Sequence, residues 1–132
     1  MKRGMVFLHK NYQFPDGGIA NKFFIIINNP GPNDPILTCK TTSKPDSRPD
    51  KEGCHYLKNV YVLRDNDDFF ELKTWVNFFS LYRFNHKGLM KLMQGGDVIK
   101  MAELRPQTIS AIVNCVKKSE DITFYDLELI KK

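Results

Sequence analysis

The clearest hydrophobic pattern in the first third of the chain is an unbroken apolar run at residues 23–27. Two phenylalanines and three isoleucines make up this run, and strands are enriched in these residue types. The run is too short for an ordinary helix, and turn-forming residues bound it on both sides, at 16–18 and 29–32. We therefore expect a strand that is buried on both faces and central to a sheet or barrel, with Lys22 at its entrance.

Further apolar segments of strand length lie on both sides of this run. They occupy residues 5–8 with an extension towards 14, then 36–41, 59–63, 69–79 and 98–101. Polar connections rich in glycine, proline or aspartate separate them, and such residues favour turns over regular structure. The spacing predicts five or six short strands, joined by tight turns and by one long loop at residues 42–53.

The segment at residues 69–79 alternates in a way that separates two faces of a strand. Residues 70, 72, 74, 76 and 78 form an apolar face, which predicts that they point into the core. The other face mixes charged residues with Trp75 and Phe79. This mixture indicates a protein interface or a platform on which bases stack. The alternative is that a loop or helix covers Trp75.

The last third of the chain changes to helical periodicity. Ile109, Ile112, Val113 and Val116 recur at the spacing of one helix face, after Pro106 at the expected first turn. Residues 87–93 predict one or two helical turns, and 122–130 a last helix capped by Ser119 or Asp121. The predicted fold is mostly β with C-terminal helices (α+β): a small barrel or strongly bent sheet over about 4–102 and helices over about 106–131, within a single domain, 1–132.

Composition and charge narrow the function classes. With 132 residues, 42% hydrophobic and 27% charged, the chain fits an ordinary globular domain. The net charge of +5 favours nucleic acid or an acidic partner. No apolar run approaches the roughly 20 residues of a membrane helix, and no secretory signal is visible. The cysteines are odd in number and widely spaced, which predicts reduced thiols in the cytoplasm and no metal site; they are Cys39, Cys54 and Cys115.

Several short patterns together resemble the PemK/Kid and MazF toxin family. An Arg3-Gly4 pair precedes the first apolar strand, and a glycine-bearing loop leads to a basic residue and a buried strand. The third strand ends in Lys40-Thr41-Thr42-Ser43-Lys44. Residues 96–100, Glu103-Leu104 and the helix at 109–116 resemble the late part of the family pattern. The similarity covers most of residues 1–118, in order and spacing more than in identical residues.

The resemblance implies an SH3-like β-barrel that forms a homodimer. Members of this family are toxin components of type II toxin–antitoxin systems, and each is neutralised by a cognate antitoxin. They are endoribonucleases that cleave single-stranded RNA, including mRNA, without a metal or other cofactor, by attack of the 2′-hydroxyl on the adjacent phosphate. Lys22 falls where the family carries an arginine, and Thr41 or Thr42 falls at its catalytic threonine. Phe23 replaces the usual proline, and Asn77 lies near the position of an acidic residue of some members.

Other candidate residues follow from the chain itself. His55, after the long loop, is expected to approach the threonines and assist as an acid or base, and His9 is an alternative. Lys10, Lys40 and Lys44 are expected to track phosphates while Trp75 and Phe79 stack bases. The alternative function is a non-catalytic SH3-like-barrel module that binds RNA or a protein partner, such as a phage or plasmid factor. For each histidine, and for the basic residues in and around the loop at 42–53, a purely structural or solvated role stays open.

Overall fold

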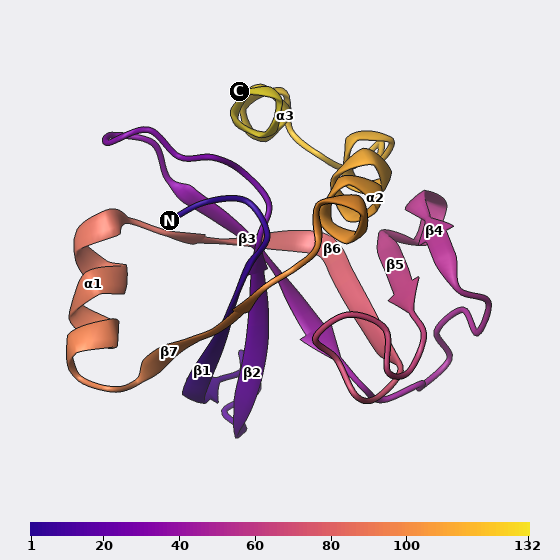
Figure 1. Ribbon diagram of the computed structural model, residues 1–132, viewed down its shortest axis with the longest axis horizontal. Helices are drawn as coiled ribbons and strands as arrows, with labels where there is room; N and C mark the ends of the chain where they lie inside the picture. Colours follow the sequence, from indigo (N-terminus) through magenta and orange to yellow (C-terminus); the bar gives the residue numbers. More distant parts are fainter.

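The computed structural model describes residues 1–132 and contains a seven-stranded antiparallel sheet and three α-helices (Figure 1). The strand order is β4-β5-β6-β3-β2-β1-β7. The strands are β1 (Met5–Gln13), β2 (Ile19–Ile26), β3 (Ile36–Thr42), β4 (Gly53–His55), β5 (Val60–Leu63), β6 (Thr74–Phe84) and β7 (Val98–Glu103). The α+β class is confirmed. Of the two expected arrangements, a small barrel or a strongly bent sheet, a closed barrel is not formed, because β4 and β7 each pair with one neighbour and leave the sheet open.

The strand that contains the apolar run lies inside the sheet, as expected. β2 pairs with β1 on one side and with β3 on the other. Phe24, Ile25 and Ile26 are fully buried. Successive side chains of a strand point to opposite faces, so Ile25 joins one core cluster and Ile26 joins another. Each fully buried isoleucine contributes about 1.5–3 kcal/mol, so this strand supports cores on both faces.

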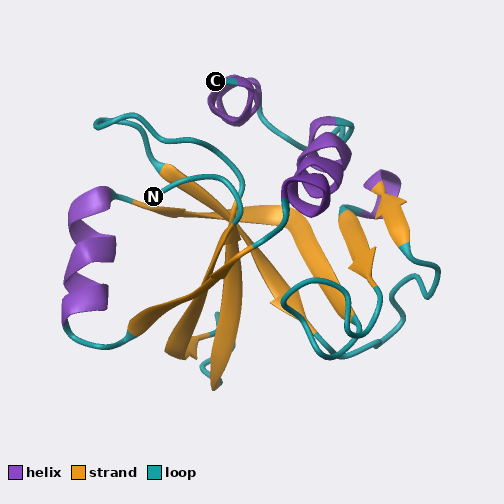
Figure 2. Cartoon of the chain, viewed as in Figure 1, coloured by secondary structure: helices purple, strands orange, loops and turns teal.

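Helices cover both faces of the sheet (Figure 2). Leu89 of α1 (His86–Gln94) packs with Phe7 and Ile26. The opposite face packs against α2 (Pro106–Lys117) and α3 (Phe124–Lys131), through residues that include Ile112 and Ile130. These helices confirm the periodicity seen in the sequence. None of the three has the length and apolar content needed to cross a bilayer.

The N-terminal cap of α3 differs from expectation. Thr123 is the cap, and its hydroxyl accepts a hydrogen bond from the Asp126 backbone N–H at 3.1 Å. Ser119 and Asp121, the expected caps, both bond the side chain of Asn59 instead. Ser119 and Asp121, which sequence reasoning assigned as helix caps, therefore make a tertiary contact with Asn59.

The strand expected at residues 69–79 is shifted along the chain. β6 begins at Thr74 and runs to Phe84. Phe69 and Phe70 both pack against Phe23, with ring centres 5.4 and 5.9 Å away, and consecutive residues of one strand would point to opposite faces. Residues 69–73 therefore form part of a connection. Thr74 and Val76 are buried as expected, whereas Leu72 is 66% exposed.

Two of the three cysteines are joined, so the expectation of reduced thiols is wrong for them. Cys54 of β4 and Cys115 of α2 form a disulfide, with Cα atoms 5.5 Å apart across 61 residues of sequence. Only the tertiary fold brings these residues together, which is why their spacing carried no signal. Cys39 is free, and burial raises the pKa of its thiol.

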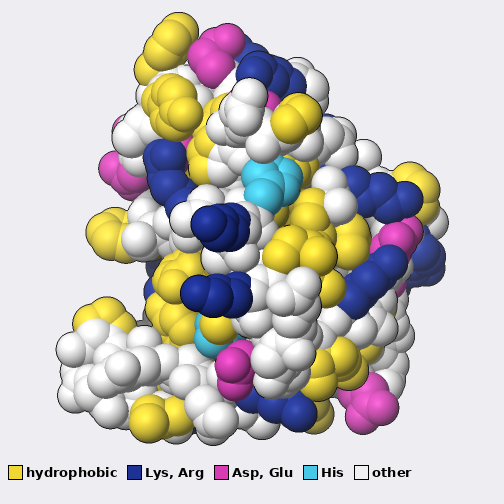
Figure 3. All heavy atoms as spheres, turned by 90° about the vertical axis from the view of Figure 1, so that its left-hand side faces the viewer, with side chains coloured by type: hydrophobic (Ala, Val, Ile, Leu, Met, Phe, Trp, Pro, Cys, Tyr) yellow, Lys and Arg dark blue, Asp and Glu magenta, His cyan; other side chains and the backbone are white.

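On the side of the molecule where α1 lies, positive side chains are interspersed with hydrophobic ones (Figure 3). The exposed hydrophobic residues of α1 and β7 include Met90, Ile99 and Met101. The lysine and arginine side chains of this face do not form one continuous stripe. The net positive charge is therefore distributed here, and a local concentration of cations must be sought elsewhere.

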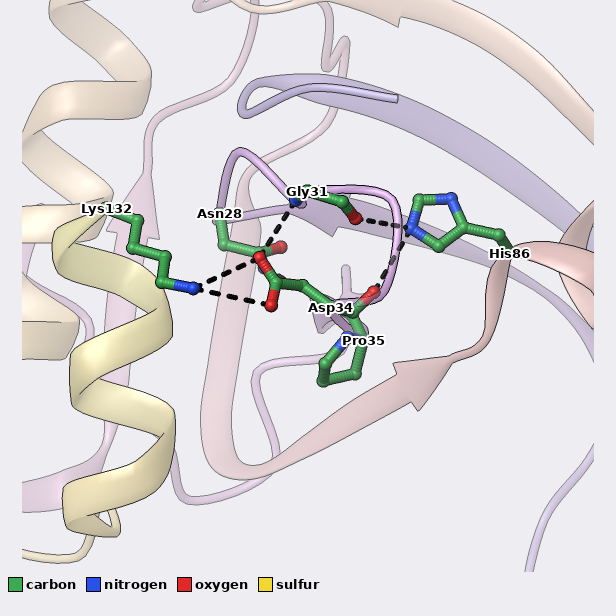
Figure 4. Close-up of polar contacts among 6 residues, drawn as sticks. All are labelled: Asn28, Gly31, Asp34, Pro35, His86 and Lys132. Atoms are coloured by element: carbon green, nitrogen blue, oxygen red, sulfur yellow. Dashed lines mark hydrogen bonds and ion pairs between the residues drawn. The ribbon is translucent and has the colours of Figure 1, made fainter.

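The proline-rich connection between β2 and β3 is held by side chains around it (Figure 4). The Asp34 carboxylate accepts a hydrogen bond from the Gly31 backbone N–H at 2.9 Å and lies 3.4 Å from Lys132 Nζ. His86 Nε2 lies 3.1 Å from the carbonyl oxygens of Gly31 and Asp34. Because carbonyl oxygens only accept, this nitrogen carries the proton, and the contact gives His86 a structural role.

Candidate functional site

A cavity of about 740 Å³ opens beside the ends of β2 and β3, next to the connection that precedes β6. We call it the strand-end pocket. Its sixteen lining residues come from both strands, from the loops after Gln13 and Thr42, from residues 69–74 and from β7. They are Phe14, Ala20, Asn21, Lys22, Phe23, Thr41, Thr42, Ser43, Lys44, Arg48, Phe69, Phe70, Glu71, Leu72, Thr74 and Met101.

Three cations line this pocket, and only one carboxylate does so. Lys22, Lys44 and Arg48 are the cations, and Glu71 is the acid. Lys22 Nζ donates to the Thr41 carbonyl oxygen at 2.9 Å and lies 5.4 Å from the centre of the Phe14 ring. Neither Lys22 nor Lys44 forms an ion pair, while Arg48 lies 3.8 Å from the exposed Asp46.

The ionisation of Lys22 responds to this concentration of positive charge. The pKa of Lys22 is lowered, and burial of the Lys22 side chain is the largest cause. The charges of three neighbouring cations lower it further, and these are Lys40, Arg48 and Lys44. Like charges held close together disfavour protonation, and an anion bound between them would offset the repulsion. The pocket therefore has the electrostatics of an anion-binding site.

The two threonines at the end of β3 play different parts in hydrogen bonding. Thr41 is buried, and its hydroxyl donates to the Phe23 carbonyl oxygen at 3.1 Å. Thr42 is half-buried, and its hydroxyl oxygen accepts from the Lys44 backbone N–H at 3.2 Å. A hydroxyl carries one proton, so Thr42 keeps its proton available for a ligand whereas Thr41 has used its own. The geometry favours Thr42 of the two.

The rest of the pocket wall is apolar and largely aromatic. Phe23 contacts Phe69, and Phe69 contacts Phe70 with ring centres 5.1 Å apart. Leu72 and Met101 complete this wall and are exposed to solvent. The strand-end pocket thus has a cationic, hydroxyl-bearing side and an apolar side, which suits a ligand that is itself partly charged and partly flat or apolar.

His55 does not join the residues it was expected to assist. It lies on β4, an edge strand that three other strands separate from β2. Its Nε2 atom is 2.6 Å from the Lys51 carbonyl oxygen, and the residue lines a separate hollow of about 260 Å³. Strand order is set by the tertiary fold, so proximity along the chain misled the prediction. His9, the alternative, packs among the aromatic rings of Tyr12, Phe24 and Phe84.

Trp75 cannot serve as a stacking platform in this structure. Its side chain is 3% exposed and packs with Val60 and Val62. The indole N–H donates to the Pro49 carbonyl oxygen at 2.7 Å, because the loop that contains Pro49 lies over the ring. The alternative reading of this residue, coverage by a loop, is the one found.

Most of the remaining expected RNA contacts lie outside the pocket. Lys44 lines it, whereas Lys10, Lys40 and Phe79 do not. Lys40 still acts on Lys22 through its charge, and its Nζ lies 5.8 Å from the centre of the Tyr12 ring. Phe79 is 72% exposed. Three of the four expected catalytic residues therefore line this pocket, and one of the five expected RNA-binding residues does so.

Sequence reasoning missed most of the residues that come from connections. Arg48 belongs to the loop expected at residues 42–53, whereas Phe69 was assigned to a strand and given no role in a site. Met101 lies in a strand, β7, as expected, but its place in the pocket was not predicted. Connections have no hydrophobic period, so the chain gives no signal of where they fold back. Nowhere in residues 1–132 do three or more metal-ligating side chains gather in a group that could hold an ion.

Comparisons with known proteins do not identify this chain. No protein-family model, no curated protein and no solved structure matches it. The resemblance to the PemK/Kid and MazF family therefore rests on the residues given above, and the function is argued from the strand-end pocket.

Proposed function

We propose that this protein is an endoribonuclease that binds single-stranded RNA in the strand-end pocket and cleaves it without a metal ion. One observation carries the proposal: Lys22, Thr41 and Thr42, three residues chosen from the sequence for this chemistry, line one cavity together with Lys44 and Arg48. RNA presents one negative charge per nucleotide, so a pocket with surplus cations suits its backbone. The resemblance to the PemK/Kid and MazF toxins agrees with this assignment.

The reaction proposed is an internal transfer. The 2′-oxygen forms a bond to phosphorus while the bond from phosphorus to the 5′-oxygen breaks, which leaves a 2′,3′-cyclic phosphate and a 5′-hydroxyl. One group must accept the proton of the 2′-hydroxyl, and another must supply a proton to the leaving oxygen. Charge that develops on the two free phosphate oxygens requires cations or hydrogen-bond donors.

The pocket contains a residue type for each of these tasks. Glu71 is the only carboxylate in the lining and is the proposed base. Lys22 is the proposed acid, because a lowered pKa makes the release of its proton easier. Arg48 supplies the planar guanidinium that the family carries at the position of Lys22, and Thr42 supplies a hydroxyl proton.

An RNA cleavage assay tests the proposal. A long unstructured transcript is incubated in EDTA with the wild type, Lys22→Ala or Glu71→Gln, and with Lys117→Ala as an exposed control outside the pocket. We expect fragments with cyclic phosphate ends from the wild type and Lys117→Ala only, with loss of at least 100-fold in the other two. Cleavage that survives Lys22→Ala, or that EDTA abolishes, would contradict the proposal.

The proposal extends to the setting that the resemblance implies. There the protein acts as the toxin of a type II toxin–antitoxin pair, forms a homodimer with an SH3-like arrangement of strands, and is neutralised by a cognate antitoxin. The strongly bent open sheet supports the strand arrangement only in outline (Figure 1). Sedimentation measurements test the dimer, and a short open reading frame with an acidic tail beside the gene would support the antitoxin.

A second candidate function is a binding module without catalysis. It is favoured by the lysine at position 22 and by the distance of His55 from the pocket, since both remove chemistry that a nuclease would use. In that case the wild type binds RNA through Lys22 and Arg48 but produces no fragments. The same assay, paired with a binding measurement on the same transcript, separates the two functions.

A further inference from the structure

The apolar side of the strand-end pocket exposes large hydrophobic side chains to solvent. Leu72 is 66% exposed and Met101 is 42% exposed, and both line the cavity with the half-buried Phe69. Single exposed hydrophobic side chains are normal on a surface. Here two of them, together with the half-buried Phe69, come from segments about 30 residues apart and face one cavity that also holds three cations.

We propose that this side is a binding site for a nucleobase, so that the pocket holds one nucleotide taken out of the strand. Its base would lie against Phe69, Leu72 and Met101, and its phosphate against Lys22, Lys44 and Arg48. This inference rests on the proposed function, because it assigns the part of the RNA that each side of the pocket contacts.

The apolar side is built by contacts that hold it in place. Arg105, just after β7, donates from its backbone N–H to the Asp68 carboxylate at 2.9 Å and from Nη2 to Asp67 at 2.7 Å. These bonds fix the connection before β6 against the end of β7, where Met101 lies. Phe70 is buried in the main core cluster, so it anchors Phe69 beside it. The side is therefore preorganised, which reduces the entropy cost of binding.

The two sides of the pocket meet at neighbouring residues of one strand. Lys22 and Phe23 are consecutive in β2, and both line the cavity. Phe23 contacts Phe69, while Lys22 bonds the Thr41 carbonyl oxygen. A ligand that touches both sides must therefore carry its anion and its apolar group close together, as a single nucleotide does.

The chemistry of a nucleotide matches both sides, whereas simpler ligands match one. A base presents a flat π-face that stacks on phenylalanine and contacts the methionine sulfur. Inorganic phosphate would engage the cations only. A volume of about 740 Å³ lies within the range of pockets that enclose a ligand of this size. Asn21 and Ser43, also in the lining, can hydrogen-bond base edges or the ribose.

Calorimetric titration of the wild type tests the inference with four mononucleoside 3′-monophosphates, inorganic phosphate and decanoate as probes. We expect at least one nucleotide to bind about tenfold or more tightly than phosphate, the increment typical of one stacked base. Leu72→Ala and Met101→Gln should remove most of that difference while leaving phosphate binding unchanged. Phe124→Ala is the matched control, since Phe124 is an exposed aromatic residue outside the cavity.

Leu72 and Met101 are exposed, so their variants are expected to fold, and a thermal unfolding curve checks this. Phosphate as tight as every nucleotide, unchanged nucleotide binding in both variants, or decanoate tighter than every nucleotide would each overturn the inference. Mononucleotides have no scissile bond, so the result does not depend on catalysis. Base-dependent binding in a protein that leaves RNA intact supports this inference and contradicts the proposed nuclease, whereas cleavage with no such binding does the reverse.

Discussion

At the scale of single residues, Lys22 lies in an environment that disfavours its positive charge. Its side chain lies among three other cations, and both burial and their charges lower its pKa. A group whose pKa is lowered in the folded state binds protons more weakly there than in the unfolded chain. The free energy of unfolding therefore rises with pH between the folded pKa of Lys22 and its unfolded value of about 10.5.

Replacement of Lys22 by methionine should separate the two effects. Lys22→Met keeps much of the aliphatic length and removes the charge, so we expect a melting temperature equal to or above that of the wild type. RNA binding should fall at least tenfold, the cost of one charge-assisted contact. Thermal unfolding and RNA binding by fluorescence anisotropy measure the two quantities. A lower melting temperature would show that the bond to the Thr41 carbonyl oxygen outweighs the repulsion.

The pH dependence of cleavage gives a second prediction for Lys22. If its protonated form donates to the leaving oxygen, the rate should decline as pH rises through its lowered pKa, below the ordinary value of about 10.5. Lys22→Arg stays protonated throughout this range, so any remaining activity should show no such decline. Single-turnover rates between pH 6 and about 10 test this, and an identical alkaline decline in both proteins would assign it to another group.

At the scale of elements, a carboxylate from a connection secures the start of α2. Asp68 accepts hydrogen bonds from the Arg105 backbone and side chain at 2.9 and 3.3 Å, while the cap residue Arg105 offers no side-chain cap. Burial alone would raise the pKa of Asp68, but bonds from Thr108 and Arg105 outweigh it and lower the pKa. The stabilisation is therefore present above the unfolded pKa of about 4 and is lost as pH falls through the lowered folded value.

Asp68→Asn should reduce the free energy of unfolding by about 1 kcal/mol at pH 7, the usual value of a charge-assisted cap bond at a partly exposed site. Urea unfolding at pH 7 and near pH 2.5 measures the difference, which should shrink at the lower pH as the wild-type carboxylate becomes protonated. Asp65→Asn, on an exposed turn residue without an ion pair, is the control. A constant difference at both pH values would argue against this role of the charge.

Elements with a strong hydrophobic period were predictable, and the connections between them were not. The run at 23–27 and the stripe at 109–116 each fix one element, and Thr42 ends β3 as expected. Lys22 was expected at the entrance of its strand but lies inside β2, because this strand begins earlier, at Ile19. Phe69 was misassigned because alternation continued by chance into a connection that folds back onto Phe23. His55 was misplaced because strand order, which separates β4 from β2, depends on contacts far apart in the chain.

At the scale of the whole molecule, the disulfide joins the far edge of the sheet to a core helix. Cys54 and Cys115 are separated by 61 residues, and closing a loop of that length restricts the unfolded chain by about 4 kcal/mol in the chain-entropy treatment. Because Cys54 is exposed and Cys115 is buried, the bond fixes a short edge strand to the interior.

Cys54→Ser should therefore lower the free energy of unfolding by about 2–4 kcal/mol under oxidising conditions. Reduced wild type should approach the stability of this variant, since both lack the cross-link. Urea unfolding with and without a dithiol reductant measures the loss, and Cys39, whose thiol is buried, serves as an internal standard in thiol counting. Equal stability before and after complete reduction would show that loss of the disulfide gives the unfolded chain no additional conformational freedom.

The open sheet leaves two strand edges, and this has a consequence for behaviour at high concentration. The outer edge of β7 has backbone groups without a strand partner beside the exposed Ile99 and Met101, a combination that promotes sheet-to-sheet aggregation. Lys100 and Glu103, 3.0 Å apart, place charges on the same edge, and Lys2 adds another at 3.3 Å. Charges of this kind act as gatekeepers, so Lys100→Val combined with Glu103→Val should form fibrillar or amorphous aggregates that light scattering detects, while the wild type stays dispersed.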